Sequence, residues 1–393
     1  MDGPWGSHFR QVLEEQAGKG LARSLVGVTS SRGPEITLNG RSVLLFCSND
    51  YLGYRQHPAL KEAAASALAE WGTGAGASRL ISGNLALYED LEKEAAAFKQ
   101  AEAALVFATG YMANTGMITG LTGPEDLILS DSLNHASLVD GCRLSKAQLR
   151  IIPHASVEAY AAALEQAQGR RVLMVTDGVF SMDGDVAPLA ELALLARKHQ
   201  ALLAVDDAHG TGVLGTRGRG CLEHAGVDPR GIIQVGTFSK ALGSLGGFVA
   251  GPELVVEVLK NRSRPFFYST ALPPATLAAN RRALALIDQE PWLRERLRQN
   301  AAILRQGLAA AGLELIPGPS AIVPVLVGPA GLALAMSRRL LDQGIFCPAI
   351  RPPTVPEGRS RLRLSVMAVH TQEQVERAVD LIEGAARKEG LIQ

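Results

Sequence analysis

The middle of the chain alternates short apolar segments with longer segments of helical periodicity, and this alternation restricts the possible folds more than any other feature. The apolar segments are short and continuous, and helical patterns at 84–100, 155–167 and 187–199 lie between several of them. Such runs are typical of strands covered on both faces, and their alternation with helices indicates a mainly parallel sheet wrapped by helices. The predicted strands are 103–108, 126–130, 149–152, 172–176, 201–205, 232–235 and 246–250. We therefore expect an α/β fold that binds its ligands at the carboxyl ends of the strands.

The sequence pattern is different before and after this region. The first fifty or so residues indicate a helix followed by a short hairpin around 38–41. Beyond the sheet, helical patterns at 274–288 and 292–312 carry the chain onward. After a Pro/Gly-rich stretch at 316–331, the pattern predicts a helix at 331–343, short strands near 345–347 and 361–366, and a terminal helix at 371–388. We predict three parts, an N-terminal segment (1–50), a large domain (51–285) and a smaller C-terminal α+β domain (286–393).

Composition excludes several classes of protein. The formal net charge is zero, which argues against a nucleic-acid or anionic-membrane partner, and no apolar run is long enough to span a bilayer. The first residues lack a hydrophobic signal core. The four cysteines (Cys47, Cys142, Cys221 and Cys347) are scattered and contain no C-x-x-C pair, so they predict neither a disulfide framework nor a zinc site. We expect a cytoplasmic protein without a metal.

Lys240 is the residue that first suggests a chemistry. It is the only charged residue of the glycine-rich stretch 236–251, and Asp206, Asp207 and His209 follow another predicted strand. A surface turn, a helix cap or part of a metal site would each explain one of these features alone. A lysine that forms an imine and a buried carboxylate that pairs with a protonated ring nitrogen are together what pyridoxal phosphate requires of a protein. Asp206 is first at the strand end and is therefore the better candidate for the ring.

Other strand ends supply candidate partners for the same cofactor. The stretch 106–116 passes from a strand through Thr109 and Gly110 into a helical pattern, and a helix N-terminus of this kind binds an anion such as a phosphate. The hydroxyls of Thr237 and Ser239, just before the lysine, are further candidates for the phosphate.

Two more segments end in polar residues. His135 follows one predicted strand and is a candidate for stacking on the cofactor ring, although a structural histidine is the commoner case. Ser181 and Asp183 follow the next strand, where a hydroxyl can reach the phenolic oxygen of the cofactor.

Seven motifs spread over nearly the whole chain carry a family resemblance. They are NDYLG (49–53), GTGAGASRLISGN (72–84), DSLNHASLVDG (131–141), FSMDGD (180–185), VDDAHGTGVLG (205–215), GTFSKALG (236–243) and IRPPTVP (350–356). Together they closely resemble the α-oxoamine synthases, which are fold-type I pyridoxal phosphate enzymes.

The resemblance implies a role for each residue around the cofactor ring. Lys240 would hold the cofactor through an imine, and Asp206 would keep the pyridine nitrogen protonated. His209 would bond the phenolic oxygen, His135 would stack on the ring face, and Ser181 would touch the same cofactor oxygen.

It also implies how the phosphate is held and how subunits associate. Gly110 and Tyr111 would support the phosphate and the ring edge, and Thr237 would bind the phosphate. The family's sites lie at a homodimer interface, where Thr270 would reach a phosphate in the partner subunit.

The substrates follow from the same resemblance. Arg363 would bind the amino acid carboxylate as a bidentate fork, and Arg23 and Thr354 would bind the acyl substrate. The implied reaction is the decarboxylative condensation of L-alanine with a pimeloyl thioester in biotin biosynthesis. The acyl carrier, coenzyme A or a carrier protein, stays open.

Rival functions differ in what they require. Sister enzymes that use glycine or serine with other acyl-CoA substrates, such as 2-amino-3-ketobutyrate ligase, share the cofactor residues and are the nearest alternative. GTGAGA (72–77) has the spacing of a dinucleotide-binding motif, but it follows a helical pattern instead of a strand. A metal hydrolase built on Asp206, Asp207 and His209 lacks further ligands. A binding protein without activity leaves the pairing of a lysine with an aspartate unexplained.

Overall fold

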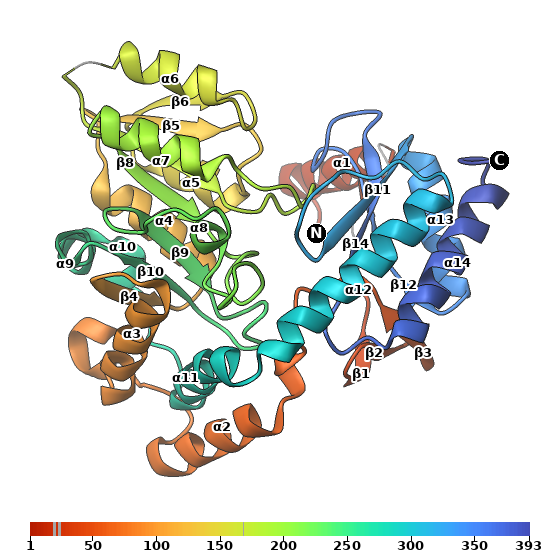
Figure 1. Ribbon diagram of the computed structural model, residues 1–393, viewed down its shortest axis with the longest axis horizontal. Helices are drawn as coiled ribbons and strands as arrows, with labels where there is room; N and C mark the ends of the chain where they lie inside the picture. The colour runs from red at the N-terminus through yellow and green to blue at the C-terminus, as the bar shows by residue number, and fades with distance from the viewer. Residues whose placement is uncertain (19–20, 23–24, 168) are drawn as a thin grey trace.

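The computed structural model describes residues 1–18, 21–22, 25–167 and 169–393. A seven-stranded sheet with the strand order β4-β10-β9-β8-β7-β5-β6 lies in the left half of the molecule in Figure 1. Its strands are β4 (Ala103–Phe107), β5 (Leu127–Asp131), β6 (Gln148–Ile152), β7 (Val172–Asp177), β8 (Leu202–Asp206), β9 (Ile233–Thr237) and β10 (Gly247–Gly251). Each of the seven apolar segments predicted as a strand supplies one strand of this sheet. The α/β prediction is confirmed.

Strand direction follows the connections between the strands. Strand β5 pairs in parallel with β6 and β7, and the parallel pairing continues through β8 to β9. Strand β10 is antiparallel to both β9 and β4. Only residues 238–246 join β9 to β10, and they contain no helix that could carry the chain back for a parallel crossover. The sheet is therefore mainly parallel, as predicted, with one antiparallel strand.

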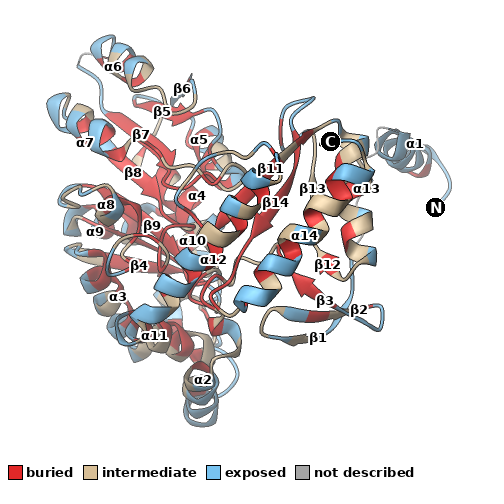
Figure 2. Ribbon diagram, turned by 45° about the vertical axis from the view of Figure 1, so that its right-hand side comes forward, coloured by how far each residue is buried: buried red, intermediate tan, exposed pale blue. Residues whose placement is uncertain are grey.

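Helices cover both faces of the large sheet. Leu105 and Phe107 of β4 pack on one face in a cluster with α4, α5, α9 and α10, whereas Ala104 and Val106 face the opposite cluster with α3, α6, α7 and α11. This alternation is the ordinary consequence of the two-residue period of a strand. Figure 2 shows the buried strands between helices whose outer faces are exposed. The helices of this part are α2 (Pro58–Trp71), α3 (Ala86–Lys99), α4 (Gly110–Leu121), α5 (Ala136–Leu144), α6 (Val157–Glu165), α7 (Leu189–Lys198), α8 (Cys221–His224), α9 (Glu253–Arg262), α10 (Arg264–Phe267) and α11 (Pro274–Gln289), with a 3-10 turn at Tyr54–Gln56 and a π turn at Arg79–Gly83.

Two smaller sheets complete the fold, and one of them combines strands from both ends of the chain. Strands β1 (Val28–Arg32), β2 (Glu35–Leu38) and β3 (Arg41–Leu45) form one sheet with β12 (Ile345–Phe346), which pairs in parallel with β3. The other sheet has the order β11-β14-β13, formed by β11 (Ile322–Gly328), β13 (Ala349–Ile350) and β14 (Ser360–Ser365). The helices are α12 (Pro291–Ala310), α13 (Ala330–Asp342) and α14 (Gln372–Lys388). The proposed division at residues 50 and 285 stays a prediction.

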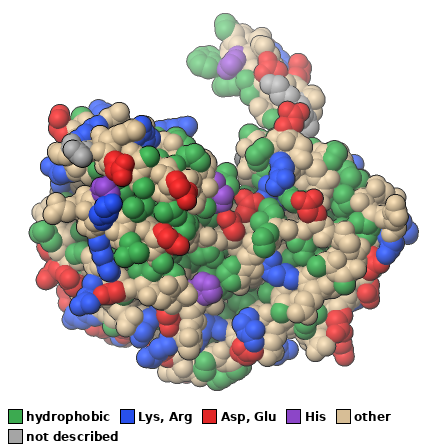
Figure 3. All heavy atoms as spheres, turned by 45° about the horizontal axis from the view of Figure 1, so that its top comes forward, with side chains coloured by type: hydrophobic (Ala, Val, Ile, Leu, Met, Phe, Trp, Pro, Cys, Tyr) green, Lys and Arg blue, Asp and Glu red, His purple; other side chains and the backbone are tan. Residues whose placement is uncertain are grey.

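The N-terminal helix α1 (Pro4–Gly18) has almost no contact with the rest of the chain. Only Gly6 of this helix is buried, and Figure 3 shows the helix standing away from the body of the molecule. Trp5, Phe9 and Leu13 are 66%, 47% and 69% exposed. They recur every four residues and therefore lie on one face of the helix as an apolar stripe. None of the described helices is both long enough and apolar enough to cross a membrane.

Candidate active site

The carboxyl ends of strands β5, β7, β8 and β9 and the N-terminus of α4 surround one cavity of about 270 Å³. Because parallel strands end at the same edge of a sheet, residues from distant parts of the chain meet there. Ten of the residues singled out in the sequence line this cavity, namely Thr109, Gly110, Tyr111, His135, Ser181, Asp206, His209, Thr237, Ser239 and Lys240. The structure thus brings the proposed cofactor residues together.

Asp206 is the last residue of β8 and is buried. Its carboxylate accepts a hydrogen bond from Asn114 Nδ2 at 2.6 Å and another from the Ala208 backbone N–H at 3.0 Å. Asn114 lies on α4 and also donates to Ser137 Oγ at 2.9 Å. Two donors therefore fix the orientation of the Asp206 carboxylate and stabilise a negative charge on it.

A second buried carboxylate, Asp177, ends the neighbouring strand β7 directly opposite Asp206. Its Oδ2 accepts the backbone N–H of His135 at 2.8 Å, which holds the loop after β5 against the cavity. Burial, followed by the charge of Asp206, raises the pKa of Asp177 well above its ordinary value. Asp177 therefore anchors His135 beside the cavity.

The ring of His135 is held in place from its own helix. His135 caps the N-terminus of α5, and its Nδ1 accepts the backbone N–H of Ser137 at 3.3 Å. Nδ1 is thus an acceptor, and the ring proton of the neutral form lies on Nε2. Burial lowers the pKa of His135, and the nearby Asp206 opposes part of that shift. A neutral imidazole is the form suited to stacking on an aromatic ring.

Lys240 follows β9 and lines the cavity. Among the residues that the structure describes, its Nζ makes neither a hydrogen bond nor an ion pair. Burial lowers the pKa of Lys240 from 10.5 to about 8, while the charges of Asp206 and Asp177 act in the opposite direction. About a tenth of this amine is therefore neutral and nucleophilic near pH 7, far more than in an ordinary lysine.

His209 lies beyond Asp206 and is almost fully buried. Burial and then the positive charges of Lys240 and Arg363 lower its pKa well below the ordinary value. Its Nδ1 lies 2.7 Å from the hydroxyl of Tyr51. The imidazole is therefore neutral and has one fixed neighbour on the side away from the cavity.

The N-terminus of α4 provides the place for an anion. Thr109 caps this helix by accepting the Met112 N–H at 3.1 Å. A Cβ on Gly247 would lie 2.6 Å from the Cα of Gly110, so glycine is needed there for β10 to approach the helix start. Thr237 accepts from the Ser239 N–H at 3.2 Å and donates to the Gly246 carbonyl at 2.8 Å. Backbone N–H groups and small hydroxyl residues therefore converge on one end of the cavity.

Two arginines project from β14 toward this region, and their environments differ. Arg361 forms an ion pair with Asp183, so its charge is compensated. Arg363 donates to the carbonyl of Ser181 and, at 3.3 Å, to Asn49 Oδ1, but it has no carboxylate partner among the described residues. Arg363 is thus a buried cation whose remaining N–H groups are available for an anionic substrate group.

The other predicted residues lie around this centre. Thr354 lines a neighbouring cavity of about 510 Å³ together with Asp183. Tyr111 is 47% exposed and donates its hydroxyl to Asp140. Thr270 pairs with Ser78 through an isolated backbone bridge and does not line the cofactor cavity. Arg23 lies outside the described residues.

The residues present fit pyridoxal phosphate. A free amine, a buried carboxylate and a helix N-terminus line one cavity, and these are the groups that an aldehyde, a protonated ring nitrogen and a phosphate require. Sequence reasoning missed Asn114, Asp177 and Tyr51, which hold Asp206, His135 and His209 in place. Within the described residues no group of His, Cys, Asp and Glu has the arrangement of a metal site.

Comparison with known proteins agrees with this geometry. The family model described as aminotransferase class I and II matches residues 41–382. The chain belongs to this family. It is 50% identical to an 8-amino-7-oxononanoate synthase of Geobacter sulfurreducens, over 97% of this chain and 98% of that protein. The solved serine palmitoyltransferase of Sphingomonas wittichii is 35% identical, with a TM-score of 0.94 and full coverage of both chains. The 8-amino-7-oxononanoate synthase structure from Francisella tularensis is 29% identical, with a TM-score of 0.77 over 88% of this chain and 99% of that one.

These similarities confirm the predicted resemblance and the fold-type I assignment. The family is one of pyridoxal phosphate-dependent enzymes, and the chain is a transferase of this class. The sequence is markedly more similar to the synthase from Geobacter sulfurreducens than to the palmitoyltransferase, although the palmitoyltransferase backbone superimposes closely. Fold similarity alone therefore does not separate the two activities.

Proposed function

We propose that this enzyme uses pyridoxal phosphate to condense L-alanine with a pimeloyl thioester in biotin biosynthesis. A bond forms between Cα of alanine and the thioester carbonyl carbon, and the free thiol and carbon dioxide leave to give 8-amino-7-oxononanoate. The identity of 50% to a synthase of that name over nearly the full length supports the choice of substrates. The observation that carries the chemistry is the unpaired amine of Lys240 in a cavity beside the buried, uncompensated Arg363.

The cofactor supplies an electron-withdrawing ring that lowers the cost of removing a proton from Cα of the amino acid. Lys240 would hold the cofactor through its aldehyde, and the partly neutral amine of this lysine would be the group that takes up a proton from Cα. Asp206, fixed by Asn114, provides the negative charge that keeps a ring nitrogen protonated. Arg363 binds the carboxylate of the amino acid and so presents Cα to the amine.

We also propose that the enzyme is a homodimer. The stripe of Trp5, Phe9 and Leu13 on α1 exposes apolar surface, which marks an interaction site in a soluble chain. Replacing all three residues with serine should lower the mass of the particle from that of a dimer to that of one chain in light scattering. An unchanged dimer would show that α1 is not part of the interface.

Thiol release tests the substrates directly. The purified enzyme, loaded with pyridoxal phosphate, is given pimeloyl-CoA with L-alanine, glycine or L-serine in separate reactions, and the free thiol is measured. Release with alanine alone is the expected result. The same assay with a pimeloyl-carrier protein identifies the acyl carrier, and Lys240→Ala serves as the inactive control.

A serine palmitoyltransferase activity is the second candidate, because the solved enzyme of that name covers the whole chain with a TM-score of 0.94. It predicts thiol release with L-serine and a long-chain acyl-CoA, and little with pimeloyl-CoA. That outcome would replace the alanine proposal while leaving the proposed cofactor unchanged.

A further inference from the structure

A line of polar contacts joins Arg363 to His209 through two residues of the NDYLG segment. Asn49 Oδ1 lies 3.3 Å from Arg363 Nη2 and also 3.3 Å from the hydroxyl oxygen of Tyr51. The same hydroxyl lies 2.7 Å from Nδ1 of His209. The proposed substrate-carboxylate residue and the proposed phenol-binding histidine are thus connected by two side chains that have no other assigned role.

We propose that Tyr51 is a positioning residue whose hydroxyl donates to His209 Nδ1 and thereby fixes the tautomer with the ring proton on Nε2. Nε2 has no partner among the described residues, and His209 lines the cofactor cavity, so Nε2–H remains as a donor to a ligand. The inference rests on the proposed cofactor, but it does not depend on which amino acid or acyl group the enzyme uses.

The distances decide the direction of the hydrogen bond. Tyr51 has a single hydroxyl proton, which goes either to His209 at 2.7 Å or to Asn49 Oδ1 at 3.3 Å. An O–H···O bond usually measures about 2.5–3.0 Å, so the contact with Asn49 is too long to compete. Asn49 Oδ1 is approached at the same distance by a guanidinium N–H of Arg363, so the tyrosine is not its only possible donor. When Tyr51 donates to His209, both the hydroxyl proton and Nδ1 therefore have a hydrogen-bond partner at a short distance.

The protonation states are consistent with this direction. Burial and the charges of Lys240 and Arg363 lower the pKa of His209, so the imidazole is neutral and carries one ring proton. Burial raises the pKa of Tyr51, with Arg363 opposing it in part, so the phenol keeps its proton. A neutral imidazole has two possible tautomers, and the partner of Nδ1 selects between them.

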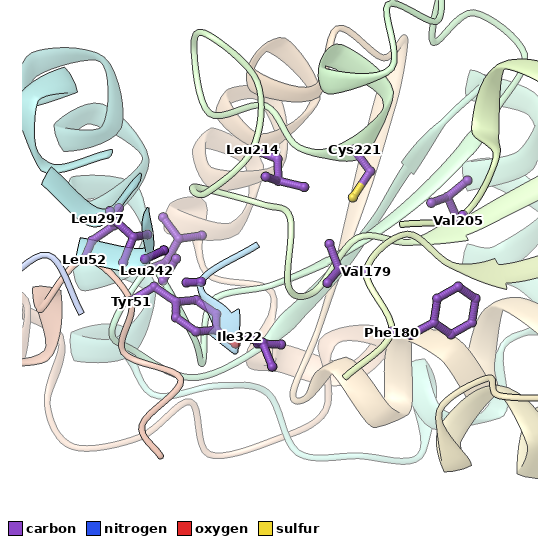
Figure 4. Packing of buried hydrophobic residues seen from close by; sticks show 14 of the residues in the cluster. Tyr51, Leu52, Val179, Phe180, Val205, Leu214, Cys221, Leu242, Leu297 and Ile322 are labelled. Carbon is purple, nitrogen blue, oxygen red and sulfur yellow. The ribbon is translucent and has the colours of Figure 1, made fainter. Parts of the chain in front are cut away.

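Packing holds the tyrosine in position. Its ring is only 1% exposed and belongs to the same buried cluster as Leu242 and Ile322 (Figure 4). Its backbone carbonyl accepts the Ala368 N–H at 2.7 Å. Because the ring and the backbone are both fixed, the hydroxyl has little freedom to move from Nδ1. Such support is what a donor needs to meet a ligand atom with the right geometry.

The first test is made on the protein without cofactor and leaves Tyr51 in place. The ring nitrogens of selectively 15N-labelled histidine are observed by NMR, and His209→Gln identifies the His209 signals by their loss. We expect a protonated Nε2 and an unprotonated, hydrogen-bonded Nδ1. A proton on Nδ1 would overturn the proposal.

The second test removes the hydroxyl. In Tyr51→Phe the His209 nitrogen signals should shift toward a mixture of tautomers. The dissociation constant for pyridoxal phosphate, followed by its visible absorption, should rise about fivefold to tenfold, which is the effect of one net hydrogen bond. The absorption maximum of the bound cofactor should shift as well, because the partner of its phenolic oxygen changes.

Tyr160→Phe is the matched control. Tyr160 is equally buried, and its hydroxyl donates to the Val175 carbonyl at 3.4 Å, away from His209. This variant should leave the His209 signals and the cofactor spectrum unchanged. Equal behaviour of the two variants would refute the positioning role. A wild-type enzyme that binds no pyridoxal phosphate would instead refute the proposed function, while the NMR result on tautomer would still stand.

Discussion

The buried ion pair between Lys99 and Asp207 supports the loop that carries His209, and its loss should be severe. Lys99 ends α3, and its side chain is not exposed at all. Its Nζ binds Asp207, Thr211 Oγ1 at 2.8 Å and the Arg219 carbonyl at 2.6 Å. The other Asp207 oxygen accepts the Cys221 N–H at 2.9 Å. One ammonium therefore ties together both ends of the loop between β8 and α8.

Replacing Lys99 with methionine keeps most of the volume but leaves the Asp207 carboxylate without its cation. Removing one partner of a buried ion pair costs about 3–5 kcal/mol, a large share of the roughly 5–15 kcal/mol by which proteins are stable. In domains of roughly 150–250 residues each kcal/mol lowers the Tm by about 2–4 °C. We therefore expect Lys99→Met to lower the Tm by about 6–20 °C.

Calorimetry of the single and double variants measures this effect. Lys99→Met combined with Asp207→Asn should be less destabilised than the sum of the two single variants, since the uncompensated charge is gone. Lys260→Met is the control, because Lys260 forms an exposed pair with Glu257 and should change the stability by less than about 1 kcal/mol. A Lys99→Met protein as stable as the control, or strict additivity in the double variant, would refute the reasoning.

Three further predictions concern the site and its surroundings. Lys240→Ala should abolish thiol release while the Tm stays close to that of the wild type without cofactor; measurable turnover would contradict the role of its amine. Arg363→Lys should raise the KM for L-alanine about tenfold or more, because the bidentate fork is lost; an unchanged KM in steady-state kinetics would assign the carboxylate to another residue. Asp131 and Asp185 raise the pKa of His154 to about 9 through hydrogen bonds. The protonated histidine therefore stabilises the folded state fully below about pH 6.5, and this stabilisation is lost as the pH rises through 9. The fall in Tm between these pH values should be smaller in His154→Gln than in the wild type. Equal Tm–pH profiles for the variant and the wild type would show that the contacts of His154 with the two aspartates are not stabilising.

The elements of the large sheet could be predicted because their signal is local. Each buried strand is a short apolar run, and residue order along the chain was enough to place Asp206, His135 and Lys240 at strand ends. The direction of β10 was not predicted, because an apolar run such as that at 246–250 looks the same in either direction. The absence of a helix between β9 and β10 was the available signal.

The residues that were missed have no local signature. Asn114 lies one turn inside a helix, and only the fold brings it within 2.6 Å of Asp206, which is 92 positions away in the sequence. Tyr51 was quoted in a motif, yet nothing near it in the sequence indicates His209 as its partner. Asp177 ends a strand as Asp206 does, so strand-end position was a signal that could have been used. Such roles depend on which residues meet in the folded chain, and a single sequence does not show those contacts.

The pairing of β3 with β12 has a consequence for biosynthesis. Strand β3 leaves the ribosome early, whereas its parallel neighbour is made about 300 residues later. At roughly 5–20 residues per second, the nascent chain exposes this strand edge for about 15–60 s after the first hairpin emerges. During that time the seven strands of the large sheet are all synthesised. The N-terminal hairpin therefore receives its last neighbouring strand, β12, only in the last quarter of translation. A chain that stops short of β12 should be a substrate for chaperones.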